Sequence, residues 1–213
     1  MSHFLITAGP TREALDPVRF ISNRSTGKMG FALAEAAAAA GHQVTLIAGP
    51  VTLATPTGVK RIDIESARDL LAAVERELPI ADIYISSAAI ADWRPETYSE
   101  TKLKKAEMDG VIRLVRNPDV LKTILPLKGD RLFVGFAAET GNPTQEATRK
   151  LRDKGLDFIV ANDVTAPGAG FAVDTNQVTL LFPNGTSETL PLMSKRDVAE
   201  IIIQRIVSLQ AKR

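Results

Sequence analysis

The chain has 213 residues, of which 45% are hydrophobic and 24% charged, a composition that suits one globular domain over residues 1–213 with a single core. Its formal net charge of +1 gives no reason to expect nucleic acid or an anionic membrane as a partner. There are no cysteines, which excludes disulfides, thiolate nucleophiles and cysteine-ligated metals. No apolar stretch approaches the roughly 20 residues that span a bilayer, and the N-terminus lacks a secretory-signal pattern, so we expect a cytoplasmic protein.

Only two residues carry an imidazole. His3 precedes the first apolar run, and His42 follows Gly41, a helix-ending glycine. We expect both histidines to be solvated turn residues rather than metal ligands.

Apolar runs and helical patterns alternate along the chain. Residues 4–8 form a short apolar run that ends at Gly9-Pro10, and the alanine-rich segment 28–40 stops at Gly41, as a capped helix does. Further strands are expected at 43–48, 61–64, 81–88, 132–138 and 158–161, and further helices at 67–78, 119–125 and 144–154. This order predicts an α/β fold, a doubly wound Rossmann-like sheet that is mostly parallel and binds ligands at the carboxyl ends of its strands.

The C-terminal part follows a different pattern. Extended runs at 178–182 and 186–190 flank Asn184-Gly185, which predicts an antiparallel hairpin over about 176–191. An amphipathic helix over 195–209 is expected to close the chain.

A long polar loop joins the first strand to the first helix, from Gly9 to Gly30. Its hydroxyls, backbone amides and adjoining helix start suit either an anion site or a plain connection. It is no Walker A loop, because Gly27-Lys28 precedes Met29 and lacks the upstream glycine, and it is too long for a GxGxxG turn.

Other candidate positions remain ambiguous from residue type alone. The small residues of 86–92, with the carboxylate of Asp92, suit either close packing or the approach of a planar ligand. The lysines at 102, 104 and 105 suit a solvated face or a lid over a nucleotide. Lys150 and Lys154 share a helix face and could serve solubility or grip phosphate, and Phe136 is by default a core residue.

Several long motifs occur together and in order: TAGPTREALDPVRFISNRSTGKMG from Thr7, AAIADWRP from Ala88, KLKK from Lys102, then VRNPDVL, VGFAAET and FIVANDV. Together they resemble the synthetase domain of bacterial phosphopantothenate-cysteine ligase, also called phosphopantothenoylcysteine synthetase. The resemblance covers essentially the whole chain. It implies a ligase of coenzyme A biosynthesis that joins 4′-phosphopantothenate to L-cysteine through an acyl-cytidylate formed from CTP.

The resemblance also assigns roles by position. Asn23 corresponds to the residue that holds the activated carboxyl group, Arg19 to one placed near it across a dimer, and Lys102 to the lysine that stabilises the α-phosphate. The implied CTP contacts are Ser86, Ser87, Ala88, Asp92, Lys102, Pro118, Asp119, Val120, Leu121, Phe136, Lys150 and Lys154. Mg²⁺ is implied on the triphosphate, with Asp92 as the first candidate ligand.

Family members form homodimers, and the hairpin at 176–191 is a reasonable place to bury a sheet edge. In many bacteria a flavin-dependent decarboxylase domain comes first on the same chain, so this sequence suits either a stand-alone form or an excised domain. Two rival functions remain. One is an NAD(P)-dependent oxidoreductase, because residues 6–9 followed by TGKMG and an alanine-rich helix are similar to a reductase fingerprint. Tyr98 and Lys102 have the Tyr-x-x-x-Lys spacing of a reductase, but their segment lacks helical periodicity, so the pair does not support this alternative. The other rival is a non-catalytic nucleotide-binding protein.

Overall fold

The computed structural model describes residues 1–105, 110–139, 143–163, 165, 168 and 170–213. Its centre is an eight-stranded sheet in the order β13-β12-β10-β9-β6-β1-β4-β5. Six of these strands run parallel: β1 (His3–Ala8), β4 (Gln43–Ala48), β5 (Val59–Asp63), β6 (Ile83–Ser86), β9 (Leu132–Glu139) and β10 (Phe158–Asp163). The predicted doubly wound, mostly parallel sheet is therefore confirmed.

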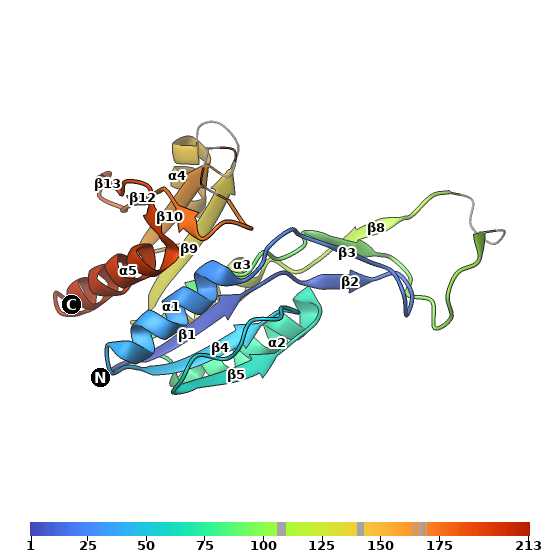
Figure 1. The fold of residues 1–213 in the computed structure, drawn as a ribbon, viewed down its shortest axis with the longest axis horizontal. Helices are drawn as coiled ribbons and strands as arrows, with labels where there is room; N and C mark the ends of the chain where they lie inside the picture. The colour runs from blue at the N-terminus through green and yellow to red at the C-terminus, as the bar shows by residue number, and fades with distance from the viewer. Residues whose placement is uncertain (106–109, 140–142, 164, 166–167, 169) are drawn as a thin grey trace.

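Helices cover both faces of the sheet (Figure 1). One face carries α1 (Lys28–Ala39) and α5 (Lys195–Gln210), and the other carries α2 (Ala67–Glu77), α3 (Val120–Ile124) and α4 (Pro143–Asp153). Because side chains alternate along a strand, Phe4 and Ile6 pack under the first pair of helices while Leu5 packs under the second set. Short 3₁₀ turns η1 (Leu78–Ile80) and η3 (Leu125–Leu127) follow α2 and α3. Among the described residues, no helix is long and apolar enough to cross a bilayer.

The predicted hairpin is present as β12 (Val178–Leu181) and β13 (Ser187–Thr189), which pair antiparallel. Its turn runs from Phe182 to Gly185, with Gly185 at φ 84° donating its N–H to the Phe182 carbonyl at 3.0 Å. Through β12 and β10 the hairpin continues the main sheet, and β13 forms one edge. Strand β11 (Thr175–Asn176) precedes the hairpin and β14 (Met193–Ser194) follows it, and these two strands pair as a small antiparallel ribbon.

Two further ribbons were not predicted. Within the loop after β1, β2 (Arg12–Ala14) pairs with β3 (Phe20–Ser22), and β7 (Trp93–Pro95) pairs with β8 (Leu114–Arg116). Together with the described residues between β7 and β8 they form an arm that projects from the body (Figure 1). Strands of three residues carry too little periodicity to be recognised in a sequence.

The histidine prediction was wrong for His3. Its side chain is buried because β1 begins at this residue, and its Nε2 and Nδ1 lie 2.9 Å from Thr45 Oγ1 and 3.0 Å from the Ile80 carbonyl oxygen. His42 is half-buried, with its ring 4.9 Å from that of Phe4. Both rings help to close the amino-terminal end of the sheet.

Close approach of α1 to β1 depends on one glycine. A Cβ atom at Gly30 would lie 2.4 Å from the Cβ of Ala8, so only glycine permits the observed spacing.

We therefore expect Gly30→Ala to destabilise the protein by about 1–3 kcal/mol, because overpacking outweighs the better helix propensity of alanine. Urea unfolding measures the change, with the exposed Glu35→Ala on the same helix as control. Equal or greater stability of Gly30→Ala would show that α1 can move away from β1 at little cost.

Candidate active site

A cavity of about 420 Å³ opens beyond the carboxyl end of β6, beside Gly135 and Phe136 of β9. We call it the strand-end cavity. Of the sequence-predicted nucleotide contacts it is lined by Ser86, Asp92, Pro118, Asp119, Val120, Leu121, Phe136, Lys150 and Lys154. Segments that lie far apart in the sequence thus converge on one hollow, at the place where a doubly wound sheet binds ligands.

A second, narrower cavity of about 110 Å³ lies at the start of α1, and we call it the helix-start cavity. Residues 25–30 of the opening loop form one wall, and Ser87 to Ala89 form another. These positions put Ser87 and Ala88 here rather than in the strand-end cavity. Phe136 is half-buried and lines both cavities, so it is not simply a core residue.

The start of α1 presents positive charge to the helix-start cavity. Gly27 caps the helix at φ 78° with no side-chain acceptor, which leaves the first amides without a side-chain cap. Nearby, the Lys28 ammonium is 2.7 Å from Asp174 and donates to the Ala172 carbonyl at 3.0 Å. These features favour an anionic ligand in this cavity.

A buried lysine that was predicted only as a helix start closes the same cavity. Lys195 donates to the carbonyl oxygens of Gly170 (2.8 Å), Phe171 (3.2 Å) and Val173 (2.5 Å), which uses all three ammonium protons. Burial, and then the neighbouring charge of Lys28, lower the pKa of Lys195. A lysine in the first turn of a helix is electrostatically unfavourable, because the helix N-terminus is itself positive. This unusual position of Lys195 in the sequence was the one signal that could have indicated a special role for it.

The loops after β1 and β6 are joined by a short run of hydrogen bonds. Ala89 donates its N–H to the Gly9 carbonyl at 2.9 Å, Thr11 donates back to the Ala89 carbonyl at 3.2 Å, and Ala91 donates to Thr11 Oγ1 at 3.0 Å. Asn23 adds its Nδ2 to the Ala89 carbonyl at 3.0 Å. The structure thereby brings Asn23 to a residue that lines the helix-start cavity.

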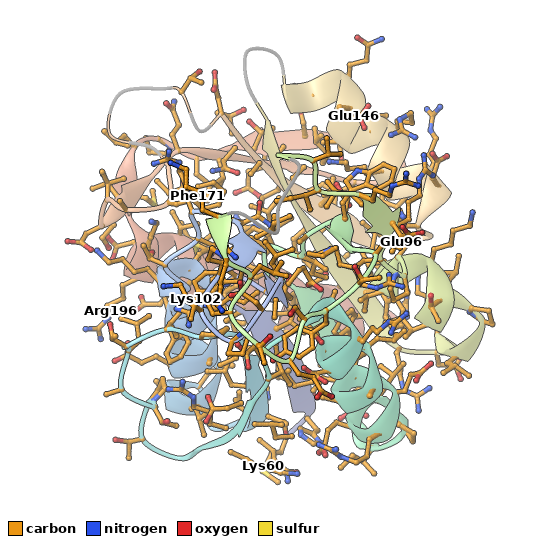
Figure 2. The ribbon with its side chains drawn as sticks, turned by 90° about the vertical axis from the view of Figure 1, so that its right-hand side faces the viewer. Lys60, Glu96, Lys102, Glu146, Phe171 and Arg196 are labelled. Atoms are coloured by element: carbon orange, nitrogen blue, oxygen red, sulfur yellow. The ribbon has the colours of Figure 1, made fainter. Side chains whose placement is uncertain are left out.

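Arg19 and Lys102 lie on the arm, and neither lines either cavity. The Arg19 guanidinium pairs with buried Asp16 and donates to the Leu103 carbonyl at 3.0 Å, while Leu103 donates its N–H to Asp16 at 3.2 Å. The segment that carries exposed Lys102, which is labelled in Figure 2, is thus attached to the turn between β2 and β3. The Arg19 guanidinium, followed by backbone amides and opposed by burial, holds the pKa of Asp16 well below its usual range.

The carboxylates of the strand-end cavity differ in their hydrogen-bond and ion-pair partners. Asp119 accepts the Lys122 N–H at the start of α3 at 3.0 Å and also pairs with Lys154, whose pKa is lowered by burial. Asp92 lines the same cavity. Among the described residues, no three His, Cys, Asp or Glu side chains gather as a ready-made metal site.

Sequence reasoning missed several residues of these cavities. Trp93, Arg116 and Asn117 line the strand-end cavity, and Asn162 and Asn176 line the helix-start cavity. Asn162 lies inside the FIVANDV motif, and Asn117 inside VRNPDVL. Inclusion in a long motif was therefore the one available indication for these two.

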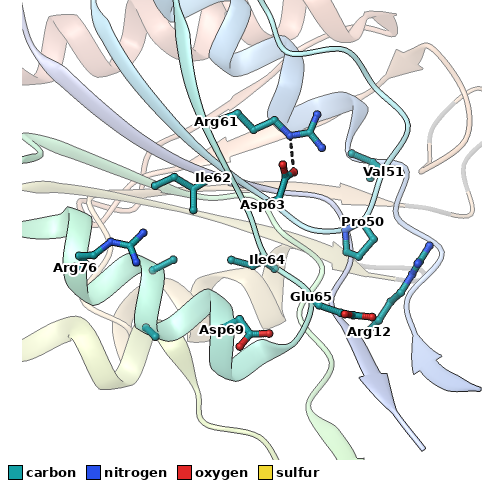
Figure 3. A pocket seen from close by; sticks show the side chains of 12 residues that line it. Arg12, Pro50, Val51, Arg61, Ile62, Asp63, Ile64, Glu65, Asp69 and Arg76 are labelled. Atoms are coloured by element: carbon teal, nitrogen blue, oxygen red, sulfur yellow. Dashed lines mark hydrogen bonds and ion pairs between the residues drawn. The ribbon is translucent and has the colours of Figure 1, made fainter. Parts of the chain in front are cut away.

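A third cavity, of about 820 Å³, lies at the sheet edge beyond β4 and β5 (Figure 3). Of its cations, Arg61 pairs with Asp63 at 2.6 Å and Arg76 with Glu77 at 3.0 Å, while the Arg12 guanidinium lies over the Phe20 ring. A Cβ on Gly49 would meet the Pro10 carbonyl oxygen at 1.8 Å, so the loops after β1 and β4 pack closely beside this cavity.

The fold and the two adjoining hollows define a doubly wound α/β protein with a candidate ligand site at its strand ends. A family described as the DNA/pantothenate metabolism flavoprotein C-terminal domain matches residues 1–209, and the chain belongs to this family. The comparisons give no support to an oxidoreductase.

Two curated relatives carry the name of a bifunctional protein. The chain is 50% identical over 208 residues to the coenzyme A biosynthesis bifunctional protein CoaBC of Bacillus subtilis, covering 97% of this chain and 51% of that protein. It is 46% identical over 210 residues to the protein of the same name from Escherichia coli, covering 97% and 52%. The chain thus spans about half the length of the curated relatives that it matches. A crystal structure of a CoaBC C-terminal domain matches with a TM-score of 0.86 and 41% identity, covering 100% of this chain and 97% of that one.

The Asp16 contacts generate a prediction for the arm. Asp16→Asn removes the charge that holds Leu103, so we expect faster hydrogen exchange of the Leu103 amide near pH 7. Because the folded-state pKa of Asp16 is depressed, its stabilising effect is fully present above the ordinary value of 3.8 and is lost only as pH falls through the lower folded value. Amide exchange followed by NMR tests both points, with exposed Asp130→Asn as control. Unchanged exchange at Leu103 in Asp16→Asn would contradict the attachment.

Proposed function

We propose that this chain is a phosphopantothenate-cysteine ligase, which uses CTP to join 4′-phosphopantothenate and L-cysteine. The name that these relatives carry supports a role in coenzyme A biosynthesis. The observation that carries the proposal is the meeting of two cavities at Phe136. The strand-end cavity has the volume and the cationic side chains to bind a nucleotide. The helix-start cavity is lined by the first residues of α1 and by Ala89, whose carbonyl accepts a hydrogen bond from Asn23.

The proposed reaction has two steps. The pantothenate carboxylate attacks the α-phosphorus of CTP, and pyrophosphate leaves. The cysteine amine then attacks the acyl carbon of the acyl-cytidylate, CMP leaves with the bonding electrons, and the nitrogen loses a proton. Activation is needed because hydroxide is a poor leaving group from a carboxylate, whereas a nucleoside monophosphate departs readily.

This chain's residues supply positioning and charge rather than a nucleophile. We assign Asn23 to the reacting carboxyl group, because its amide is fixed on the Ala89 carbonyl between the two cavities. Lys102 would neutralise charge that develops on the α-phosphate, and Arg19 would lie near the same centre in a dimer. The strand-end cavity residues named above would hold CTP, with Ser87 and Ala88 at its junction with the helix-start cavity.

The carboxylates of the strand-end cavity suit a Mg²⁺ ion that is shared with substrate phosphates. Magnesium in nucleotide sites is held by one or two carboxylates together with substrate phosphates. Asp92 is the carboxylate we assign, because Asp119 is already engaged by Lys154 and by the start of α3. When bound, the ion would add positive charge beside the triphosphate.

Pyrophosphate release tests the function and separates it from the two rivals. Incubation with phosphopantothenate, cysteine, Mg²⁺ and CTP should release pyrophosphate only when both CTP and the acid are present. NAD(P)H turnover without CTP-dependent pyrophosphate would sink the ligase proposal. Nucleotide binding without any turnover would favour a non-catalytic binding protein.

Lys102→Gln should fold normally and lose about a hundredfold or more in kcat, because it removes one cation at the transition state and no core volume. Lys105→Gln removes an exposed cation from the same lysine run and is the matched control. Steady-state pyrophosphate assays measure both. Near-normal turnover of Lys102→Gln would return Lys102 to the class of solvated surface lysines.

We also propose a homodimer, and a flavin-dependent phosphopantothenoylcysteine decarboxylase, fused or separate, as the enzyme that uses the product. The described hairpin 176–191 exposes mainly polar side chains, whereas the arm exposes Val18, Phe20, Tyr98, Val111, Ile112 and Leu114. Exposed apolar surface of this extent favours the arm as the contact between subunits.

Light scattering on chromatographed protein tests the assembly. Val18→Asp with Ile112→Asp should give a monomer, because both charges fall on the exposed apolar arm. Ser187→Lys, on the exposed hairpin edge, should leave the dimer intact. The reverse result would place the interface at the hairpin, and a monomeric starting protein would refute the dimer.

A further inference from the structure

Trp93 and Arg116 form a stacked pair at the mouth of the strand-end cavity. They lie directly opposite each other on β7 and β8, and the Arg116 guanidinium carbon is 5.2 Å from the centre of the Trp93 ring. Both side chains line the cavity. The indole ring therefore attracts the guanidinium by a cation–π contact, which uses none of the guanidinium N–H groups as hydrogen-bond donors to an internal acceptor.

The backbone beneath this pair is fixed on both sides. Asn117 donates its N–H to the Asp92 carbonyl and its Nδ2 to the Ala91 carbonyl, both at 2.8 Å. The Arg94 guanidinium donates to the Arg116 carbonyl at 2.5 Å and to Asn117 Oδ1 at 3.2 Å. The backbone that carries the pair is thus fixed before any ligand arrives, which lowers the entropy cost of binding.

The Arg116 guanidinium lacks the internal acceptors that several other arginines of the chain have. Arg61 and Arg205 pair with carboxylates, and Arg131 donates to a set of carbonyls. Within the part of the chain that the structure describes, the Arg116 guanidinium makes no hydrogen bond or ion pair, and its contact is the Trp93 ring. Lys154, on the same cavity, is already paired with Asp119. The cavity mouth thus offers a planar, permanently charged fork of donors with no partner of its own.

We propose that Arg116 binds a phosphate group of the nucleoside triphosphate in the strand-end cavity and that Trp93 is the positioning residue that orients it. The nucleotide itself rests on the function proposed above, whereas the phosphate contact can be tested without turnover. A guanidinium edge suits phosphate oxygens because it donates two parallel hydrogen bonds. The indole acts only through the arginine and does not stack on the nucleobase.

Trp93 is the one tryptophan of the sequence, so its fluorescence reports directly on this site. Titration with inorganic pyrophosphate and with CTP should change the emission, and titration with cytidine should not. Arg116→Gln should weaken pyrophosphate binding about tenfold, the size expected for one charge-assisted phosphate contact. Arg113→Gln is the matched control, because Arg113 is an exposed arginine of the same segment that does not line this cavity. An emission change with cytidine but none with pyrophosphate would overturn the proposal in favour of base stacking.

Kinetics of single and double variants separate positioning from direct contact. Arg116→Gln should raise the KM for CTP about tenfold with little change in kcat, reduce its salt dependence, and be partly rescued in Arg116→Lys. Trp93→Ala should raise the same KM severalfold in the wild-type background and have almost no effect in Arg116→Gln, because Trp93 acts through Arg116. Additive effects would refute the positioning role. A wild-type protein that binds pyrophosphate but forms no amide would refute the ligase function and leave the phosphate contact standing.

Discussion

The hydrogen bonds between the loops after β1 and β6 are the constraint on which the site depends. Gly9, Thr11, Ala89 and Ala91 exchange backbone and hydroxyl hydrogen bonds where two adjacent parallel strands end. A buried backbone group left unpaired here would be costly, so the two loops fix each other. Their common ridge forms the wall between the helix-start and strand-end cavities, and it holds Asn23 at Ala89.

Electrostatics then distinguish the two cavities. The helix-start cavity combines the uncapped start of α1 with Lys28 and Lys195, and these two lysines hold the segment 170–174 by its carbonyls and by Asp174. The strand-end cavity mixes cations with the carboxylates of Asp92 and Asp119. One cavity therefore suits an anion alone, and the other suits an anion accompanied by a metal ion.

The arm extends this arrangement away from the body. Its ribbons begin where the two joined loops leave the sheet, so Trp93 and Arg116 stay at the cavity while Arg19 and Lys102 lie further out. Asp16 attaches the Lys102 segment to the β2–β3 turn through partly buried, charge-assisted hydrogen bonds. Lys102 thus lies on an arm that exposes apolar side chains. Its proposed role therefore depends on which protein surface packs against the arm.

The sequence by itself determined the alternation of strands and helices and the doubly wound sheet, because apolar runs such as 4–8 and the alanine-rich 28–40 are local patterns. Its long motifs also indicated most residues of the strand-end cavity. Tertiary structure decided what depends on distant partners: the burial of His3 between β4 and η1, the division of the opening loop into an arm ribbon and a cavity wall, and the carbonyl cage around Lys195. Trp93 and Arg116 stand 23 residues apart and become neighbours only when β7 and β8 pair, a contact that no local pattern encodes.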